Sequence, residues 1–152
     1  DREAVTQAFQ DGTLDTLATD HAPHHYDEKE REFSDAPNGI VGLETALAVV
    51  ATHLVVPGIL SWTTLVDRMS TSPARVFGLA GGTLRRGSVA DVTILDPAAQ
   101  WTVDPDTFLS KGRNSPYRGK RLTGRATCTI VGGRVVFRND GRGPMGDGGR
   151  VA

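Results

Sequence analysis

The stretch Leu14-Asp15-Thr16-Leu17-Ala18-Thr19-Asp20-His21-Ala22-Pro23-His24-His25 sets the α/β character of this chain. Its first half, Leu14 to Thr19, is short, rich in Leu and Thr and entered through Asp11-Gly12, which predicts a strand of an α/β unit. The strand is expected to end at Asp20. Because groups at the carboxyl ends of parallel strands point into a shared site, this position favours a functional role for Asp20 and His24.

The chemistry of these two side chains suits several roles. Asp20 offers a hard carboxylate for a divalent metal or a general base, and His24 can ligate a metal or, when protonated, pair with an anion. Two plain alternatives stay open, because an Asp after a strand can cap a turn and a His can be an ordinary surface residue. A helical zinc site through His21 and His24 is disfavoured because Pro23 would break the helix. A metal here needs more ligands than the segment supplies.

Helices and one long loop are predicted around this stretch. Val5, Ala8 and Phe9 recur at helical spacing before Gly12, which predicts a helix over residues 2–10. Residues 20–39 are predicted to form a long loop, and loops of this length are often functional. One further helix is expected over residues 43–54, and a second after Ser61 as its cap. A third short helix is expected with Ser72 at the cap, Pro73 at the first helical position and Gly78 past the end.

After Ala80 the pattern changes from helices to strands. Ser88–Leu95 and Ala126–Val131 are rich in β-branched residues, and the second meets Arg134–Arg138 across Gly132-Gly133, which predicts a hairpin. Cys128, the single cysteine, is expected to be a small core residue rather than a nucleophile.

Composition excludes several classes of protein. The chain has 152 residues, of which 38% are hydrophobic, so it can fill a core. One cysteine excludes a disulfide scaffold and a thiolate zinc finger and predicts a cytoplasmic chain. The longest apolar run, residues 46–56, is too short for a membrane span. The six basic residues from Lys111 to Arg125 have only Tyr117 among them, so a solvated loop is favoured over a nucleic-acid site.

Longer motifs carry a resemblance to a known family. Ala18–His24, followed by Asp27-Glu28-Lys29 and Ala36–Thr45, resembles the C-terminal part of a dihydroorotase of the amidohydrolase superfamily. Further stretches resemble the same family in the same order, namely Ser72–Leu79, Gly87–Asp96, Arg113–Tyr117 and Thr129–Val135. The resemblance covers nearly the whole chain.

The resemblance implies an α/β fold: the C-terminal part of a (β/α)8 metal-dependent hydrolase barrel followed by a small β-sandwich domain. Residues 1–80 would supply the eighth strand, the active-site loop and closing helices, residues 81–138 a portion of the β-sandwich domain, and residues 139–152 a flexible tail. A (β/α)8 barrel takes about 250 residues, so the N-terminal barrel portion is missing. The chain begins with Asp1-Arg2-Glu3, without an initiator Met, and we expect a fragment that is inactive alone.

The resemblance also implies a reaction, the reversible zinc-dependent hydrolysis of (S)-dihydroorotate to N-carbamoyl-L-aspartate in pyrimidine (UMP) biosynthesis. One or two Zn²⁺ ions would be bound per site in a cytoplasmic homo-oligomer. Asp20 would bind zinc and carry the proton between water and the departing amide nitrogen. His24 would hold the substrate carboxylate. Asn38 and Gly39 would line the substrate ring, chiefly through their backbones.

Three other interpretations compete with this one. A hydantoinase or allantoinase would share the motifs without needing His24 for a carboxylate. A catalytically silent dihydroorotase-like subunit would keep the fold for assembly, although retention of Asp20 and His24 argues against it. A basic binding module over residues 111–125 would bind nucleic acid in a salt-sensitive way. We expect no nucleic-acid or membrane partner.

Overall fold

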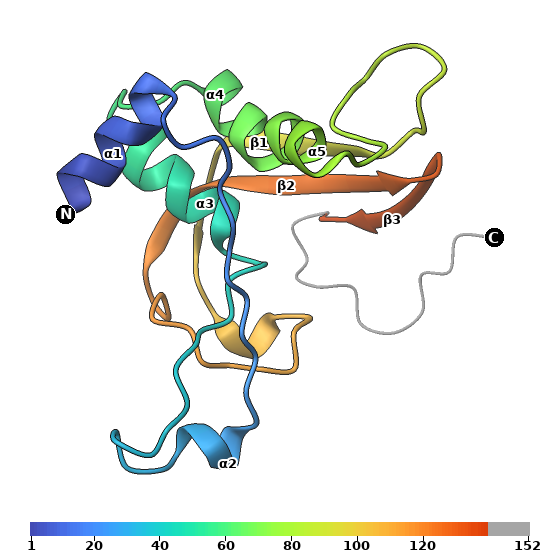
Figure 1. Ribbon diagram of the computed structural model, residues 1–152. Coiled ribbons are helices and arrows are strands. Elements are labelled where there is room, and N and C mark those ends of the chain that lie inside the picture. The colour runs from blue at the N-terminus through green and yellow to red at the C-terminus, as the bar shows by residue number, and fades with distance from the viewer. Residues whose placement is uncertain (140–152) are drawn as a thin grey trace.

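The computed structural model describes residues 1–139 as a layer of helices packed on a three-stranded sheet (Figure 1). The helices α1, α3, α4 and α5 gather at one end of the long strands, and the loop that carries α2 lies at the other end. The elements are α1 Arg2–Asp11, α2 Tyr26–Lys29, α3 Ala46–Val50, η1 Ala51–Val55, α4 Trp62–Val66, η2 Asp67–Thr71, α5 Ser72–Phe77, β1 Val92–Thr102, η3 Pro105–Thr107, β2 Arg121–Val131 and β3 Arg134–Arg138.

The N-terminal helix is confirmed, and the strand predicted after it is not formed. Helix α1 ends at Gly12, whose φ of 85° is the left-handed cap expected of glycine. Residues 14–19 belong to no helix and no strand, and the nearest pairing is a single parallel bridge between His21 and Ile40. The physical reason is that a strand exists only through its neighbours, and no strand among residues 1–139 lies beside this segment to bond it.

The two main helices each contain a π-helical segment. α3 continues without a break into η1, so the helix predicted over residues 43–54 forms from Ala46 onward. The Ser61 cap is confirmed, because its Oγ accepts the backbone N–H of Thr64.

The predicted cap at Ser72 is wrong. α4, η2 and α5 form one continuous helix, and Ser72 lies inside it with a helical φ of −66° and no exposed surface. Its backbone N–H bonds Asp67 five residues back, which widens the turn ahead of Pro73, a residue without an N–H to donate. The helix ends at Gly78 as predicted.

The sheet is antiparallel with the order β1-β2-β3. The hairpin across Gly132-Gly133 is confirmed, and its φ values of 55° and 80° are those of a type I′ turn. The strand predicted from Ser88 instead begins at Val92 and runs on to Thr102. Its register shifts between Asp96 and Gln100, around Pro97, which cannot donate to a ladder.

The core lies where the α3–η1 helix crosses β2. Buried apolar side chains from three parts of the chain meet there, namely Val41, Ala48, Val103, Phe108 and Leu122. Gly124 lets the layers approach, because a Cβ there would lie 3.0 Å from Trp62 and 3.2 Å from Ala51. Val41 has no exposed surface, so the loop that precedes it is anchored in the core.

The sequence predicts that Cys128 is a small core residue, and Cys128 is buried. The predicted tail lies outside the described residues except for Asn139. None of the helices within residues 1–139 combines the length and apolarity of a membrane span.

Candidate active site

Asp20 stands at the end of the extended segment in an uncommon backbone conformation. Its φ of 45° makes it the only residue other than glycine with a positive φ among residues 1–139. Aspartate tolerates this region better than most residues, and such positions cluster at functional sites. Its side chain is exposed, and its carboxylate has no hydrogen-bond or ion-pair partner in the described part of the chain. The carboxylate is therefore free to bind a ligand.

His24 lies four residues further on and is held in place from both ring nitrogens. Nε2 lies 2.9 Å from the carbonyl oxygen of Asn38, and since a carbonyl only accepts, Nε2 carries the hydrogen in this arrangement. Nδ1 lies 3.5 Å from the carboxylate of Glu28, a contact that becomes an ion pair when the ring is protonated. The ring is only partly exposed, which suits a side chain that binds a ligand better than one that only contacts solvent.

The loop over residues 37–40 turns its carbonyl groups away from free solvent. Pro37 O accepts from Lys29, Asn38 O from His24, Gly39 O from Lys29 and Asn114, and Ile40 O from the backbone of Ala22. No acceptor among residues 1–139 takes the N–H of Asn38 or of Gly39. These two N–H groups are therefore backbone donors that the described residues leave free.

Gly39 fits the close approach that the sequence suggested. Its φ is 125°, and a Cβ at this position would lie 2.6 Å from Ala22 Cβ and 3.2 Å from His24 Nε2. The structure thus brings His24, Asn38 and Gly39 together. Asp20 lies next to them in the sequence of contacts, because it directly precedes His21, which is paired with Ile40 in the β-bridge.

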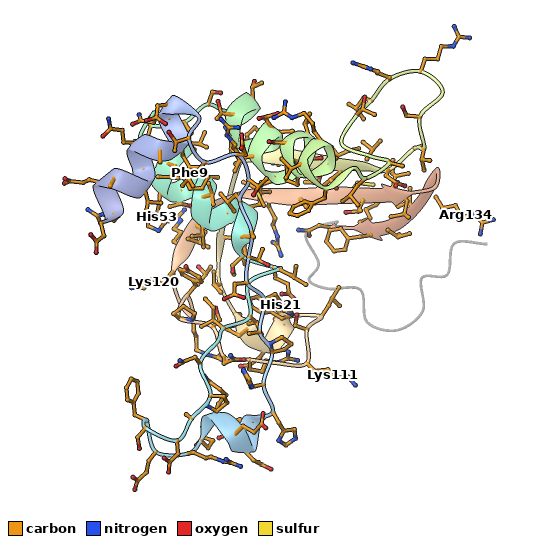
Figure 2. All side chains as sticks on the ribbon, in the orientation of Figure 1. Phe9, His21, His53, Lys111, Lys120 and Arg134 are labelled. Carbon is orange, nitrogen blue, oxygen red and sulfur yellow. The ribbon has the colours of Figure 1, made fainter. Side chains whose placement is uncertain are left out.

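His21 has a structural role. Its Nδ1 accepts the backbone N–H groups of Gly42 and Leu43 at 3.1 and 3.3 Å, which leaves Nε2 to face the Ser110 hydroxyl at 3.5 Å. In Figure 2 the ring lies between the helix layer and the loop of α2. Glu44 adds a second tie, because it accepts the N–H of Ser110 at 2.8 Å.

The short helix α2 is also capped from this motif. His25 Nδ1 accepts the N–H of Asp27, and the Glu28 carboxylate accepts the N–H of His25, which together form a capping box. The phenol of Tyr26 faces Glu30, and this hydrogen bond raises the pKa of Tyr26. His25 therefore shapes the loop.

Sequence reasoning missed two residues of this site. Lys29 and Asn114 both donate to the backbone around Gly39, yet they lie 85 positions apart in the chain. Each stands in a stretch that carries the family resemblance, and that was the available signal. Nothing in either stretch shows that the two side chains converge.

A metal would find one ligand here, not a complete site. Residues 1–139 contain no group of three or more His, Cys, Asp and Glu side chains that could hold an ion. The Asp20 carboxylate fits one position of a zinc site by its chemistry, its exposure and its lack of a partner. The remaining ligands would have to come from outside the described residues.

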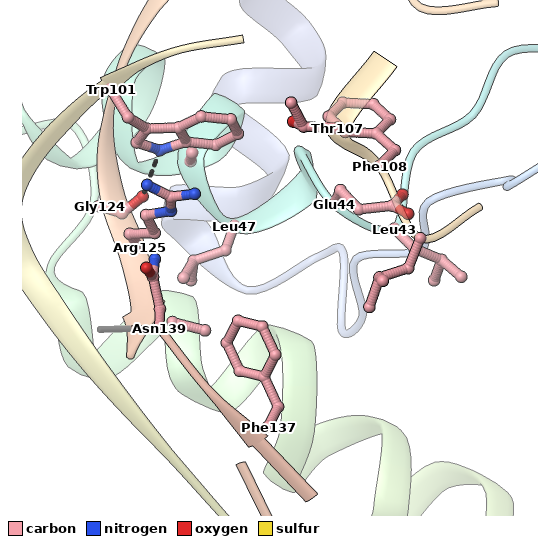
Figure 3. Close-up of a pocket in the computed structure, with 13 residues that line it drawn as sticks. Leu43, Glu44, Leu47, Trp101, Thr107, Phe108, Gly124, Arg125, Phe137 and Asn139 are labelled. Atoms are coloured by element: carbon pink, nitrogen blue, oxygen red, sulfur yellow. Dashed lines mark hydrogen bonds between the residues drawn. The ribbon is translucent and has the colours of Figure 1, made fainter. Parts of the chain in front are cut away.

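A separate pocket lies between the start of α3 and the sheet (Figure 3). Its lining includes Glu44, Trp101 and Phe137, and the Arg125 guanidinium stacks 5.0 Å from the centre of the Trp101 ring. Glu44 Oε2 is enclosed there without a donor from the described residues. None of the candidate site residues, Asp20, His24, Asn38 or Gly39, lines this pocket.

Comparison with known proteins agrees with this α/β arrangement. A sequence model described as the amidohydrolase family matches residues 37–137, and the chain belongs to that family. Among relatives, a dihydroorotase of Geobacter metallireducens is 54% identical over 138 residues, and one of Anaeromyxobacter dehalogenans is 57% identical over 140 residues. These matches cover 91% and 92% of this chain but 32% of each relative, so the chain spans about a third of their length.

Solved structures of similar fold are cyclic amide hydrolases. The chain matches an L-hydantoinase (dihydropyrimidinase) from Arthrobacter aurescens with a TM-score of 0.81 and 39% identity, covering 88% of this chain and 31% of that one. It matches a dihydropyrimidinase from Brevibacillus agri with a TM-score of 0.83 and 30% identity, covering 90% and 31%.

Proposed function

We propose that this chain is the C-terminal third of a dihydroorotase, which hydrolyses dihydroorotate reversibly to N-carbamoyl-L-aspartate in pyrimidine biosynthesis. The observation that carries the proposal is the Asp20 carboxylate, which has no partner among residues 1–139 and stands at a positive φ four residues before His24. The higher identity to dihydroorotases, 54% and 57%, than to the hydantoinase, 39%, favours this substrate.

We assign residues 1–80 to the end of a (β/α)8 barrel and residues 81–138 to part of a β-sandwich domain. Support for the barrel comes from residues 14–19, which have the composition of a strand and have no strand beside them in the described chain. Barrel strands supplied by the rest of the protein would satisfy their hydrogen bonds. The second sheet of the sandwich and the homo-oligomer remain predictions.

Asp20 would be one ligand of a bound zinc ion. Zinc would supply Lewis acidity and a water molecule of lowered pKa. An Asp20 carboxylate oxygen would accept a proton from the attacking water molecule, while the water oxygen forms the new bond to the ring carbonyl carbon. The same oxygen would deliver the proton to the ring nitrogen as the C–N bond breaks, so the carboxylate is regenerated in each cycle.

His24 would bind the carboxylate that distinguishes dihydroorotate from neutral cyclic amides. Its Nε2–H now donates to the Asn38 carbonyl. A substrate carboxylate would compete well for this hydrogen, because hydrogen bonds to charged acceptors are stronger than those to neutral carbonyls. The free N–H groups of Asn38 and Gly39 would donate to the oxygens of the substrate ring.

The test is a hybrid enzyme in which residues 1–152 replace the matching third of the Geobacter metallireducens dihydroorotase. We expect the hybrid to bind zinc and to turn over dihydroorotate, and the 152-residue chain alone to do neither. Asp20→Asn should lower kcat by about 10²- to 10⁴-fold, the usual contribution of a general base. Asp35→Asn is the matched control, because Asp35 lies in the same loop and its carboxylate accepts, within residues 1–139, only from the Ser34 hydroxyl.

Three results would count against the proposal. A hybrid that hydrolyses hydantoin or dihydrouracil but not dihydroorotate would point to a hydantoinase. A folded, zinc-loaded hybrid without any hydrolase activity would point to a silent subunit. An Asp20→Asn variant with full turnover would remove the assigned role of Asp20.

A further inference from the structure

The carbonyl oxygen of Gly39 receives two side-chain donors from distant segments. Asn114 Nδ2 lies 2.9 Å from it and Lys29 Nζ lies 3.3 Å from it. Asn114 lies in the connection between β1 and β2, after η3, whereas Lys29 ends α2 in the long loop. Two segments far apart in the sequence therefore meet on one backbone atom.

Asn114 is bound to this loop through both its side chain and its backbone. Its Nδ2 also reaches the carbonyl of Ala22 at 3.4 Å, and its own carbonyl accepts the N–H of Val41 at 3.1 Å. These contacts fix the orientation of the amide, because a flip would place Oδ1 against two carbonyl oxygens. Oδ1 itself is enclosed without a donor from the described residues.

Lys29 acts here as a binder of carbonyl groups. Its Nζ is partly buried and donates to Pro37 O at 2.8 Å as well as to Gly39 O. Within residues 1–139 no carboxylate lies in ion-pair range of it. Its charge is therefore directed at the loop backbone.

These contacts determine where the free N–H groups of the loop point. Lys29 on the Pro37 carbonyl holds the peptide unit that carries the Asn38 N–H, and His24 on the Asn38 carbonyl holds the unit that carries the Gly39 N–H. Asn114 and Lys29 on the Gly39 carbonyl hold the following peptide unit, which limits rotation about the Gly39 backbone between the two. Neither Asn114 nor Lys29 needs to touch the substrate for this effect.

We propose that Asn114 and Lys29 are positioning residues that hold the loop backbone at the carbonyls of Pro37 and Gly39, on either side of Asn38, and thereby orient the N–H groups of Asn38 and Gly39 and the ring of His24 for substrate binding. This inference rests on the proposed function for the identity of the substrate. The alternative is a purely structural tie that stabilises the chain without affecting how substrate binds.

Substitutions of Asn114 in the hybrid enzyme separate these possibilities. Asn114→Ala removes the donors and the volume, whereas Asn114→Asp keeps the volume and directs a carboxylate at two carbonyls. We expect both to raise KM for dihydroorotate, by about tenfold in the Ala variant and by more in the Asp variant, with kcat and zinc content within about twofold of the parent. Lys29→Met should raise KM in the same direction.

Hydrogen exchange provides a readout that needs no substrate. In Asn114→Ala and Lys29→Met, the peptide containing residues 36–42 should exchange faster than in the parent, while peptides of β2 should be unchanged. Ser115→Ala, whose hydroxyl serves only the N–H of Tyr117, is the matched control for the neighbouring segment.

Three outcomes would overturn the inference: unchanged exchange in residues 36–42, a lower Tm with unchanged KM, or an Asp variant milder than the Ala variant. A parent hybrid that uses another cyclic amide instead of dihydroorotate would refute the proposed function alone. The changes in KM for that amide in the Asn114 and Lys29 variants, together with the hydrogen-exchange result, would then test whether the two residues position the loop. If Asn114→Asp does not fold, the Ala and Met variants still decide.

Discussion

Gly39 and Ala22 approach so closely that a Cβ on residue 39 would lie 2.6 Å from Ala22 Cβ. The contact joins the loop over residues 37–40 to the segment that follows Asp20. The φ of 125° at Gly39 is a second barrier to any other residue. Backbone conformation and space therefore both require glycine at this point of the candidate site.

Gly39→Ala should therefore damage the site and the fold together. We expect a loss of about 2–5 kcal/mol in the free energy of unfolding of the hybrid enzyme, from backbone strain and overpacking. KM for dihydroorotate should rise in any fraction that folds. Gly58→Ala is the matched control, because Gly58 has a φ of 78° with nothing within 4 Å, so strain alone should cost about 1 kcal/mol. Equal losses in the two variants would contradict the close contact.

Local signals in the sequence were sufficient where one short segment determines the structure. Gly12 ends α1 and Gly132-Gly133 forms the hairpin, because each depends on backbone preferences of one or two residues. The resemblance assigned His24, Asn38 and Gly39, from two separate stretches, to substrate binding, and the structure brings these three residues together.

Prediction from the sequence failed where the local structure depends on residues that are distant in the chain. Residues 14–19 have strand composition, yet strand pairing needs neighbours that the described chain does not contain. Ser72-Pro73 has the usual sequence of a helix start, but the preceding helix continues through a π-helical turn, so Ser72 lies inside the helix instead of capping a new one. The convergence of Lys29 and Asn114 on Gly39 depends on tertiary packing, which spacing along the chain does not encode.

His24→Ala should change substrate selection more than turnover. We expect KM for dihydroorotate to rise roughly 10- to 100-fold, as for loss of a hydrogen bond to a charged group, while any turnover of the neutral analogue dihydrouracil should be unaffected. Steady-state kinetics of the hybrid with both compounds measure this difference. His53→Ala is the control, since His53 is exposed on η1 in the helix layer, away from His21 (Figure 2). Unchanged KM for dihydroorotate in the His24 variant would exclude the carboxylate-binding role.

The ion pair between Asp106 and Arg118 should make a small, pH-dependent contribution to stability. Two hydrogen bonds of 2.8 and 2.9 Å from the guanidinium lower the pKa of Asp106 below its ordinary value. A carboxylate with a lowered pKa in the folded state stabilises at pH values above its unfolded pKa, and this stabilisation is lost as the pH falls through the folded pKa. The pair is exposed, so the effect is limited by solvent screening.

Arg118→Met should therefore lower the Tm of the hybrid slightly at pH 7, and the difference from the parent should vanish in acid. Thermal melts across this pH range provide the measurement. Arg121→Met, a neighbouring exposed arginine without an ion pair among the described residues, should show no such pH dependence. A difference in Tm that persists below the folded pKa of Asp106 would have another cause.

Gly124 should be required for the contact between the helix layer and β2 rather than for chemistry. A Cβ at this position would lie 3.0 Å from Trp62 Cη2 and 3.2 Å from Ala51 Cβ, and its φ of 91° adds strain. We expect Gly124→Ala to destabilise the hybrid by about 2–4 kcal/mol, with KM for dihydroorotate unchanged in the folded fraction. Gly119→Ala, at a φ of 74° with nothing within 4 Å, should cost only about 1 kcal/mol.

The contact itself can be tested by shortening its partner. Trp62→Phe removes the ring atom nearest to the added methyl group, so the double variant with Gly124→Ala should lose less stability than the sum of the two single variants. Such non-additivity is expected only for residues in contact. Denaturant unfolding of the four proteins gives the coupling free energy, and strict additivity would show that the contact with Trp62 does not contribute to the loss, which would then come from the φ of residue 124 and its contact with Ala51.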